Sequence, residues 1–252
     1  MLLTEIDAVD WNAIPAPRPR PRADDARHGA RAGRPDPAAA LRALAAARDL
    51  DAAAAAVAAL AASPLLRGHG GEVLPGAVVA APFLLDIAER GHPYARESSV
   101  LLLDGAMRSA PLAGFSRIRT AAGHDAPLCC AIADIVRDRR DALSACGRSG
   151  GYLLTASDAH WRFDVREASR TADAPDDVVA LGTLRGGPPV PSSGGELHHD
   201  GSVTAVGAVG VECPPVDAGA GACLRLSGLA AAAVDGGGLA GAVLYPADGH
   251  AR

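Results

Sequence analysis

The sequence predicts an α+β protein in which an N-terminal stack of α-helical hairpins is joined to a smaller C-terminal β-rich module. Two observations carry this prediction. Apolar residues recur at helical spacing between residues 36 and 156, whereas strand-like alternation and more than half of the 29 glycines follow residue 157. We therefore expect a flexible Pro/Arg-rich arm over residues 1–35, a helical domain over 36–156 and a Gly-rich, β-rich module over 157–252.

The first 35 residues combine an apolar start with alternating prolines. Residues Ile6 to Trp11 form an anchor-like segment, and every second residue from Pro15 to Pro21 is proline. Proline cannot donate a backbone hydrogen bond and favours an extended path. A solvated linker is therefore favoured over recognition of a Pro-x-x-Pro motif by a partner.

Two tightly joined helices begin the predicted helical domain. Asp36 and Pro37 provide an N-cap and a proline at the first helical position, where its missing N–H costs nothing. Leucines then recur at helical spacing, and a second helix that starts near Asp51 ends before Pro64. The short connection predicts a helical hairpin.

A second hairpin is predicted next in the chain. The segment from Val73 to Arg90 is apolar nearly throughout, and Pro82 within it predicts that the helix bends there or begins anew. After a very short link, Tyr94 to Arg108 carries an apolar stripe that includes Leu103. We expect these helices to pack antiparallel, with Leu103 buried between them.

A third apolar stripe runs from Leu128 to Leu143, with charged residues on the opposite face and Pro127 at the helix start. The glycines between Gly147 and Gly151 follow it, where glycine normally ends a helix. Together the three stripes predict a stack of about three helical hairpins.

The second hairpin resembles one repeat of the HEAT and armadillo-like helical repeat proteins. The resemblance rests on Val78 to Ala88, with Pro82 inside it, followed after a short break by Tyr94 to Leu103. In that family the first helix commonly has an interior proline, and the second opens with a charged pair, here Arg96 and Glu97. The start at Asp10 and Trp11 and the helix with Leu41 and Leu44 are also similar to bacterial HEAT-like proteins of unassigned activity.

The resemblance implies an extended concave surface that recognises another protein. It assigns no catalytic residue, because the repeats of that family are structural.

Strand periodicity begins with Trp161, Phe163 and Val165, which alternate with charged residues; a helix is the alternative for this segment. Further runs typical of strands are bounded by glycines and prolines. We expect them to form a small antiparallel sheet. These runs are Val178 to Leu184, Gly195 to His199, Ser202 to Glu212, Ala222 to Leu226 and Ala240 to Tyr245.

Composition excludes several classes of function. Of the 252 residues, 49% are hydrophobic, but close to half of these are alanine and only 3% are aromatic, so the expected core is thin. No uncharged run reaches the roughly 18 apolar residues that cross a membrane, and the first residues lack the pattern of a signal peptide. The net charge of -5 disfavours nucleic acid as a partner. We expect a soluble cytoplasmic protein without a membrane or nucleic-acid partner.

The inventory of basic and sulfur-containing residues excludes further chemistry. All 24 basic residues are arginine, so no lysine can form a Schiff base or bind phosphate. The five cysteines lack Cys-x-x-Cys spacing and fit reduced thiols better than a disulfide framework or a zinc ribbon. Cys129 and Cys130 begin a helix whose dipole can favour a thiolate, but buried thiols are the expected state.

One segment, Glu196 to Gly201, contains residues that could carry chemistry. His198, His199 and Asp200 are ligand types for zinc or iron, and His160 or Glu212 could supply the outer groups that orient these ligands. An Asp-Gly pair between two strands is also the strongest short signal of a hairpin turn. The turn is favoured over a metal site, because neighbouring side chains on a strand point to opposite faces.

These observations favour a non-enzymatic protein-binding or scaffold protein that uses a helical-repeat surface, with no catalytic residue and no cofactor. The alternative is a small metal-dependent hydrolase whose site lies around His198, His199 and Asp200.

Overall fold

The computed structural model describes residues 5–17, 36–63, 71–120, 123–171, 174, 177–214, 221–229 and 238–247. Contacts divide the chain into two compact units, Met1–Ser116 and Arg117–Arg252, and each is described by itself. The division precedes the third predicted group of helices, which share a unit with the strands. Most of the predicted Pro/Arg-rich arm, residues 18–35, lies outside the described residues.

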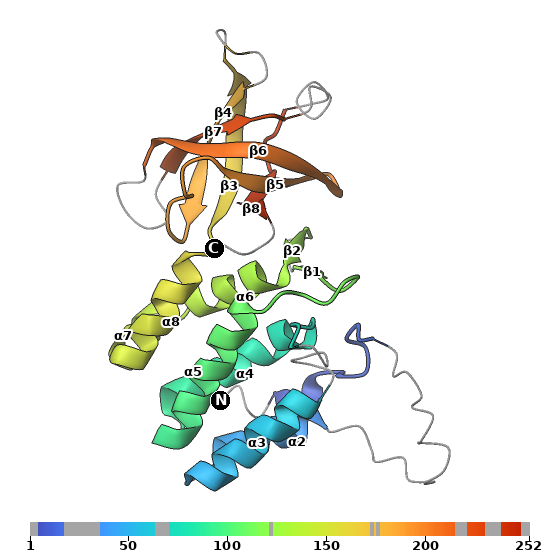
Figure 1. Ribbon diagram of the computed structural model, residues 1–252, viewed down its shortest axis with the longest axis vertical. Coiled ribbons are helices and arrows are strands. Elements are labelled where there is room, and N and C mark those ends of the chain that lie inside the picture. The colour runs from blue at the N-terminus through green and yellow to red at the C-terminus, as the bar shows by residue number, and fades with distance from the viewer. Residues whose placement is uncertain are drawn as a thin grey trace. The chain divides into compact units, whose positions relative to one another are not determined.

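The N-terminal unit begins with a short 3-10 turn, η2 (Ile6–Ala8), followed by the helices α2 (Pro37–Ala46) and α3 (Leu50–Ala62) (Figure 1). Carboxylate caps begin both helices, because the first amides of a helix lack internal acceptors. Asp36 accepts a 3.0 Å bond from the amide of Ala38, and Asp49 accepts a 2.8 Å bond from the amide of Ala52. The predicted first hairpin is confirmed.

No helix in the described ranges combines the length and apolar character needed to cross a membrane.

The helices α4 (Gly76–Arg90) and α5 (Pro93–Arg108) form the second predicted hairpin, joined by two residues. Helix α4 continues through Pro82 instead of beginning anew there, and most of its residues are buried. The N-terminal segment packs on this helix, because the ring of Trp11 lies 6.2 Å from the ring of Phe83 and Ile6 is fully buried. Leu103 is buried, as predicted.

The resemblance to HEAT and armadillo-like proteins is wrong. The described part of the N-terminal unit holds two hairpins, α2–α3 and α4–α5, and the third predicted helical segment belongs to the other unit. A repeat stack needs at least three equivalent units, each covering the apolar face of the previous one. The local signals of paired helices were correct, but such pairs also occur outside repeat proteins.

The C-terminal unit starts with the short strands β1 (Arg117–Arg119) and β2 (Asp125–Pro127), which pair antiparallel. Helices α6 (Leu128–Arg137), α7 (Arg140–Ala145) and α8 (Arg148–Asp158) follow. The predicted third stripe is thus divided between α6 and α7. Gly147 follows the end of α7, as predicted, and its positive φ of 69° turns the chain directly into α8.

Six antiparallel strands form the rest of this unit, and their positions agree closely with the predicted strand segments. They are β3 (Arg162–Arg170), β4 (Asp177–Arg185), β5 (Ser193–His199), β6 (Ser202–Cys213), β7 (Gly221–Ser227) and β8 (Val243–Pro246). The strands pair antiparallel, as expected, but the sequence did not indicate that they close into a barrel, in the order β3-β4-β7-β6-β5-β8 (Figure 1). The fold class is α+β with a closed barrel, and the HEAT-like stack is absent from the described residues.

Closure depends on β8, which pairs with β3 on one side and β5 on the other. Register shifts in β3, β5 and β6 mark β-bulges, which increase the local twist and bend that a barrel requires. Gly182 on β4 allows the close approach of β3, because a Cβ there would lie 2.2 Å from the Asp164 carbonyl oxygen.

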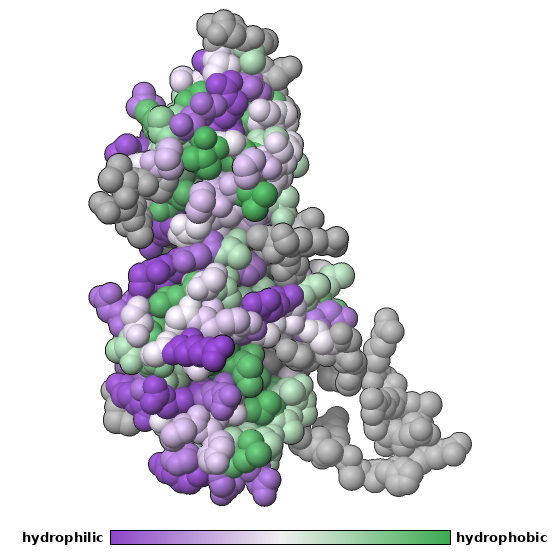
Figure 2. Space-filling view, turned by 60° about the vertical axis from the view of Figure 1, so that its left-hand side comes forward, coloured by the Kyte–Doolittle hydropathy of each residue, from purple (hydrophilic) through white to green (hydrophobic). Residues whose placement is uncertain are grey.

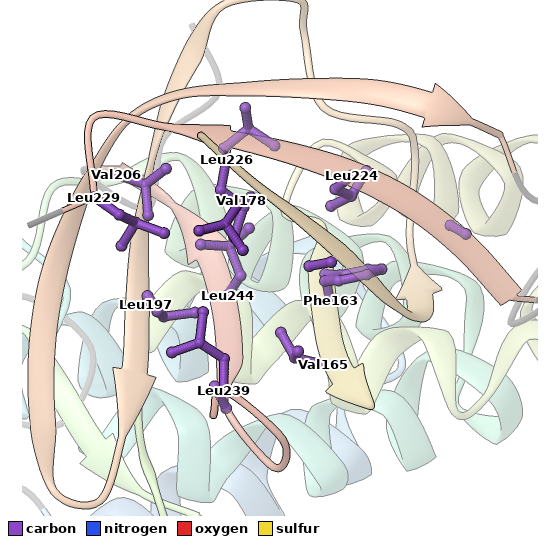
Figure 3. Packing of buried hydrophobic residues seen from close by; sticks show 14 of the residues in the cluster. Phe163, Val165, Val178, Leu197, Val206, Leu224, Leu226, Leu229, Leu239 and Leu244 are labelled. Carbon is purple, nitrogen blue, oxygen red and sulfur yellow. The ribbon is translucent and has the colours of Figure 1, made fainter. Parts of the chain in front are cut away.

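Side chains fill the barrel. The buried cluster drawn in Figure 3 includes Phe163, Val178 and Leu244, and each of the three is at most 1% exposed. Barrels of few strands have an interior that side chains fill, so the centre is a core and not a channel. On the face shown in Figure 2, hydrophilic and apolar residues are interspersed over the surface.

We predict that the two neighbouring leucines of α5 differ sharply in their contribution to stability. Leu103 is 1% exposed and Leu101 is 62% exposed. Leu103→Ala should lower the free energy of unfolding by about 2–5 kcal/mol, because it leaves a cavity. Leu101→Ala should change it by less than about 0.5 kcal/mol. Urea denaturation followed by circular dichroism measures both, and equal losses would contradict the packing described for α5.

A second prediction concerns barrel closure. Gly182→Ala should destabilise the C-terminal unit by about 1–3 kcal/mol, because the new methyl group meets the Asp164 carbonyl and the Phe163 ring, at 2.2 and 2.8 Å. Gly151→Ala in α8 is the matched control, since a Cβ there has nothing within 4 Å. It should leave stability unchanged or raise it by up to about 1 kcal/mol. Thermal denaturation compares them, and a harmless Gly182→Ala would show that β3 and β4 are not closely packed.

Candidate functional site

The candidate site of the C-terminal unit is a pocket of about 530 Å³ where β5 ends and β8 begins. Glycines from three turns line it: Gly123 between β1 and β2, Gly201 between β5 and β6, and Gly241 before β8. Each has a positive φ and open space at its Cβ position. Glycine adopts this conformation without strain, and the missing side chains leave the pocket open.

Charged and hydrogen-bonding side chains make up most of the remaining lining. They are one guanidinium, three imidazoles, two carboxylates and a hydroxyl, so the pocket offers donors, acceptors and charges of both signs. These residues are Arg119, His124, Asp125, His198, His199, Asp200 and Ser202.

The predicted hairpin turn at Asp200 and Gly201 is confirmed. Both residues have positive φ, 49° and 74°, as a type I′ turn requires. The turn joins paired His199 and Ser202, and the Ser202 hydroxyl donates a 2.6 Å bond to the His199 carbonyl oxygen.

The two predicted histidines differ in burial. The His198 side chain is 4% exposed, whereas that of His199 is 26% exposed and its Nδ1 lies 3.7 Å from the Asp200 carboxylate. Leu197, between Glu196 and His198, belongs to the barrel core. Because side chains alternate along a strand, Glu196 and His198 lie on the outer face of the barrel.

A network of five side chains connects this outer face with the β1–β2 hairpin. Tyr245 on β8 lies 2.8 Å from the Nε2 of His124, and the His198 ring packs edge-on against the Tyr245 ring at 5.2 Å. Glu196 lies 3.4 Å from His198 Nε2 and accepts a 2.6 Å bond from Arg117. We call these residues, Arg117, His124, Glu196, His198 and Tyr245, the hairpin network.

Burial and neighbouring charges set the protonation of the hairpin network. Bonding to His198 and to Arg117 lowers the pKa of Glu196, so this residue is a carboxylate at neutral pH. Burial raises the pKa of Tyr245, which keeps its hydroxyl protonated. Burial and the charge of Arg162 lower the pKa of His124 from its usual 6.5, which favours the neutral imidazole.

The structure does not gather the metal-ligand candidates chosen from the sequence. Among the described residues, His198, His199 and Asp200 do not form a group whose ligand atoms all lie within 4.8 Å of one another. Glu212 bonds instead to Arg225 at 2.5 Å. His160 belongs to a different group, with Cys129 and Cys130.

Sequence reasoning missed Arg117, His124 and Tyr245. Tyr245 was placed correctly at the end of a strand, but nothing in the sequence indicated its contact with His124, which lies 121 positions away.

No protein family, curated protein or solved structure matches the chain significantly. The function is therefore inferred from the geometry and charges of the pocket.

We predict that Glu196 stabilises the C-terminal unit in a pH-dependent way. Its pKa is lower in the folded chain than the usual 4.5, so its contribution is complete above about pH 4.5 and disappears as the pH falls through the folded pKa. Glu196→Gln should lower the free energy of unfolding at pH 7 by on the order of 1 kcal/mol. The difference from wild type should shrink in acid.

Urea denaturation of both proteins between pH 7 and pH 3 provides the measurement. Glu167→Gln, which removes an exposed carboxylate on β3, is the control and should have little effect at any pH. A loss in Glu196→Gln that stays constant down to pH 3 would rule out the proposed charge dependence.

Proposed function

We propose that the C-terminal unit is a non-enzymatic binding module whose pocket takes a small hydrophilic molecule with charged groups of both signs, such as a free amino acid or a short peptide. The observation that carries the proposal is the lining: Arg119 with Asp125, and His199 with Asp200, face the same pocket. A zwitterion brings a carboxylate that Arg119 can bind and an ammonium that Asp125 and Asp200 can bind.

The Arg119–Asp125 ion pair and the contact of His199 with Asp200 can exchange partners with a ligand at little cost. Arg119 and Asp125 are 3.6 Å apart and half exposed or more, and His199 and Asp200 are 3.7 Å apart with Asp200 88% exposed. Exposed ion pairs of this length contribute at most about 1 kcal/mol. A ligand that replaces them therefore loses little of the protein's own stabilisation.

The rest of the fold supports binding at this position. The barrel interior is filled with side chains, so the place for a ligand is the pocket outside it, beside the outer face that carries His198. The volume of about 530 Å³ is within the range of about 300–1,000 Å³ that is usual for small-molecule sites. The bonds of His124 and His198 within the hairpin network fix two of the lining imidazoles before any ligand arrives.

The two functions expected from the sequence have less support. Recognition of a protein by a helical-repeat surface loses its basis, because no such repeat is present in the described residues. A protein partner stays a prediction. A metal-dependent hydrolase around His198, His199 and Asp200 would need ligand atoms that converge, and these atoms do not.

Binding can be tested with the full chain and an equimolar mixture of the twenty standard amino acids at neutral pH. Saturation-transfer NMR should show that one or a few of them receive saturation from the protein. Arg119→Gln should weaken that binding by about tenfold, the effect of losing about 1.4 kcal/mol of interaction with a carboxylate.

Arg166→Gln is the control, because this exposed arginine of β3 does not line the pocket and its loss changes the net charge equally. Its affinity should equal that of the wild type. If no amino acid receives saturation, or if both variants bind alike, the proposed ligand class is wrong.

A further inference from the structure

We propose that Cys129, Cys130 and His160 form a binding site for a divalent thiophilic metal ion of the zinc type. The site is buried in the C-terminal unit and does not include any residue that lines the pocket. The proposal is independent of the ligand proposed for the pocket.

The geometry brings three suitable donors together. Each residue offers one ligand atom, two sulfurs and one imidazole nitrogen, and all three atoms lie within 4.8 Å of one another. Neighbouring ligands of a tetrahedral zinc ion are about 3.8 Å apart, given Zn–S bonds of about 2.3 Å. The donors would therefore need to close by about 1 Å at most, which changes of side-chain torsion can supply.

The donors come from two elements that the fold holds together. Cys129 and Cys130 lie in the first turn of α6, and His160 lies between α8 and β3. The Arg137 guanidinium of α6 donates a 3.0 Å bond to the His160 carbonyl oxygen and a 2.7 Å bond to Asp134. The bond from Arg137 to the His160 carbonyl oxygen holds the backbone of His160 against α6. The positions of the three donors therefore do not depend on a mobile loop.

The burial of the three side chains favours a metal complex without net charge. The three side chains are at most 5% exposed, and an uncompensated charge is costly there. A divalent ion that displaces both thiol protons gives a complex of zero net charge, whereas a monovalent ion leaves one negative charge.

Binding thus exchanges one Zn²⁺ for two protons released to solvent, with two Zn–S bonds and one Zn–N bond formed and no change of oxidation state. Three protein ligands leave a fourth tetrahedral position for water or another small ligand. The group found among the described residues contains these three donors and no other.

A disulfide between Cys129 and Cys130 is the competing fate of the pair. Consecutive Cα atoms are about 3.8 Å apart, shorter than the roughly 4.4–6.8 Å spanned by disulfides. Both residues are also helical, and forming the bond would distort the first turn of α6. The fold therefore favours the dithiol, which is the form that binds a metal.

The test uses the full chain, reduced and freed of metal with a chelator. Titration with Zn²⁺ against a chromophoric competitor should show saturation at one equivalent, together with a rise in melting temperature. Co²⁺ should produce the thiolate-to-cobalt charge-transfer absorption that reports Co–S bonds, and this readout needs no mutation.

Cys129→Ala combined with Cys130→Ala should abolish both effects, whereas Cys146→Ala, which removes a thiol outside the group, should retain them. A wild type without the charge-transfer absorption and without a zinc-dependent melting temperature would overturn the proposal. Retention of both effects in the double variant would overturn it as well. If the double variant does not fold, the cobalt spectrum of the wild type decides.

Discussion

Closure of the barrel by the four-residue strand β8 is the constraint on which the C-terminal unit depends. Leu244 is paired with both Phe163 of β3 and Leu197 of β5, so one residue joins the two ends of the sheet. Without it, β3 and β5 would expose unpaired backbone groups along their edges. All four residues of β8 are buried. The strand lies between β3 and β5, and side chains cover both of its faces.

The same strand links the barrel core to the candidate site. Because side chains alternate, Leu244 enters the interior while Tyr245 faces outward, where it meets His124 and His198. The hairpin network thereby holds the β1–β2 hairpin, one wall of the pocket, on the barrel. The pocket therefore depends on the register of β8. A shift of one position would turn Tyr245 into the barrel interior and Leu244 outward.

Local features could be predicted from the sequence, and features that join distant residues could not. The cap at Asp36, the turn at Asp200 and Gly201 and the strand positions each depend on a few neighbouring residues. Barrel closure and the contact between His124 and Tyr245 depend on pairings across much of the chain. The helical-repeat interpretation failed for the same reason. The apolar stripe of α6 shows that the helix is amphipathic, but it does not show which of the two units the helix packs in.

The pocket and the cysteine group have no residue in common, but the charged side chain of Asp134 lies near both. Asp134 of α6 is paired with Arg137, which holds His160, and with Arg162, which lowers the pKa of His124. A charge introduced at the cysteines would therefore act on the pocket through this carboxylate. A neutral complex of a divalent ion with two thiolates introduces none, since it replaces two neutral thiols. The divalent complex that we propose would therefore leave the charges around the pocket unchanged.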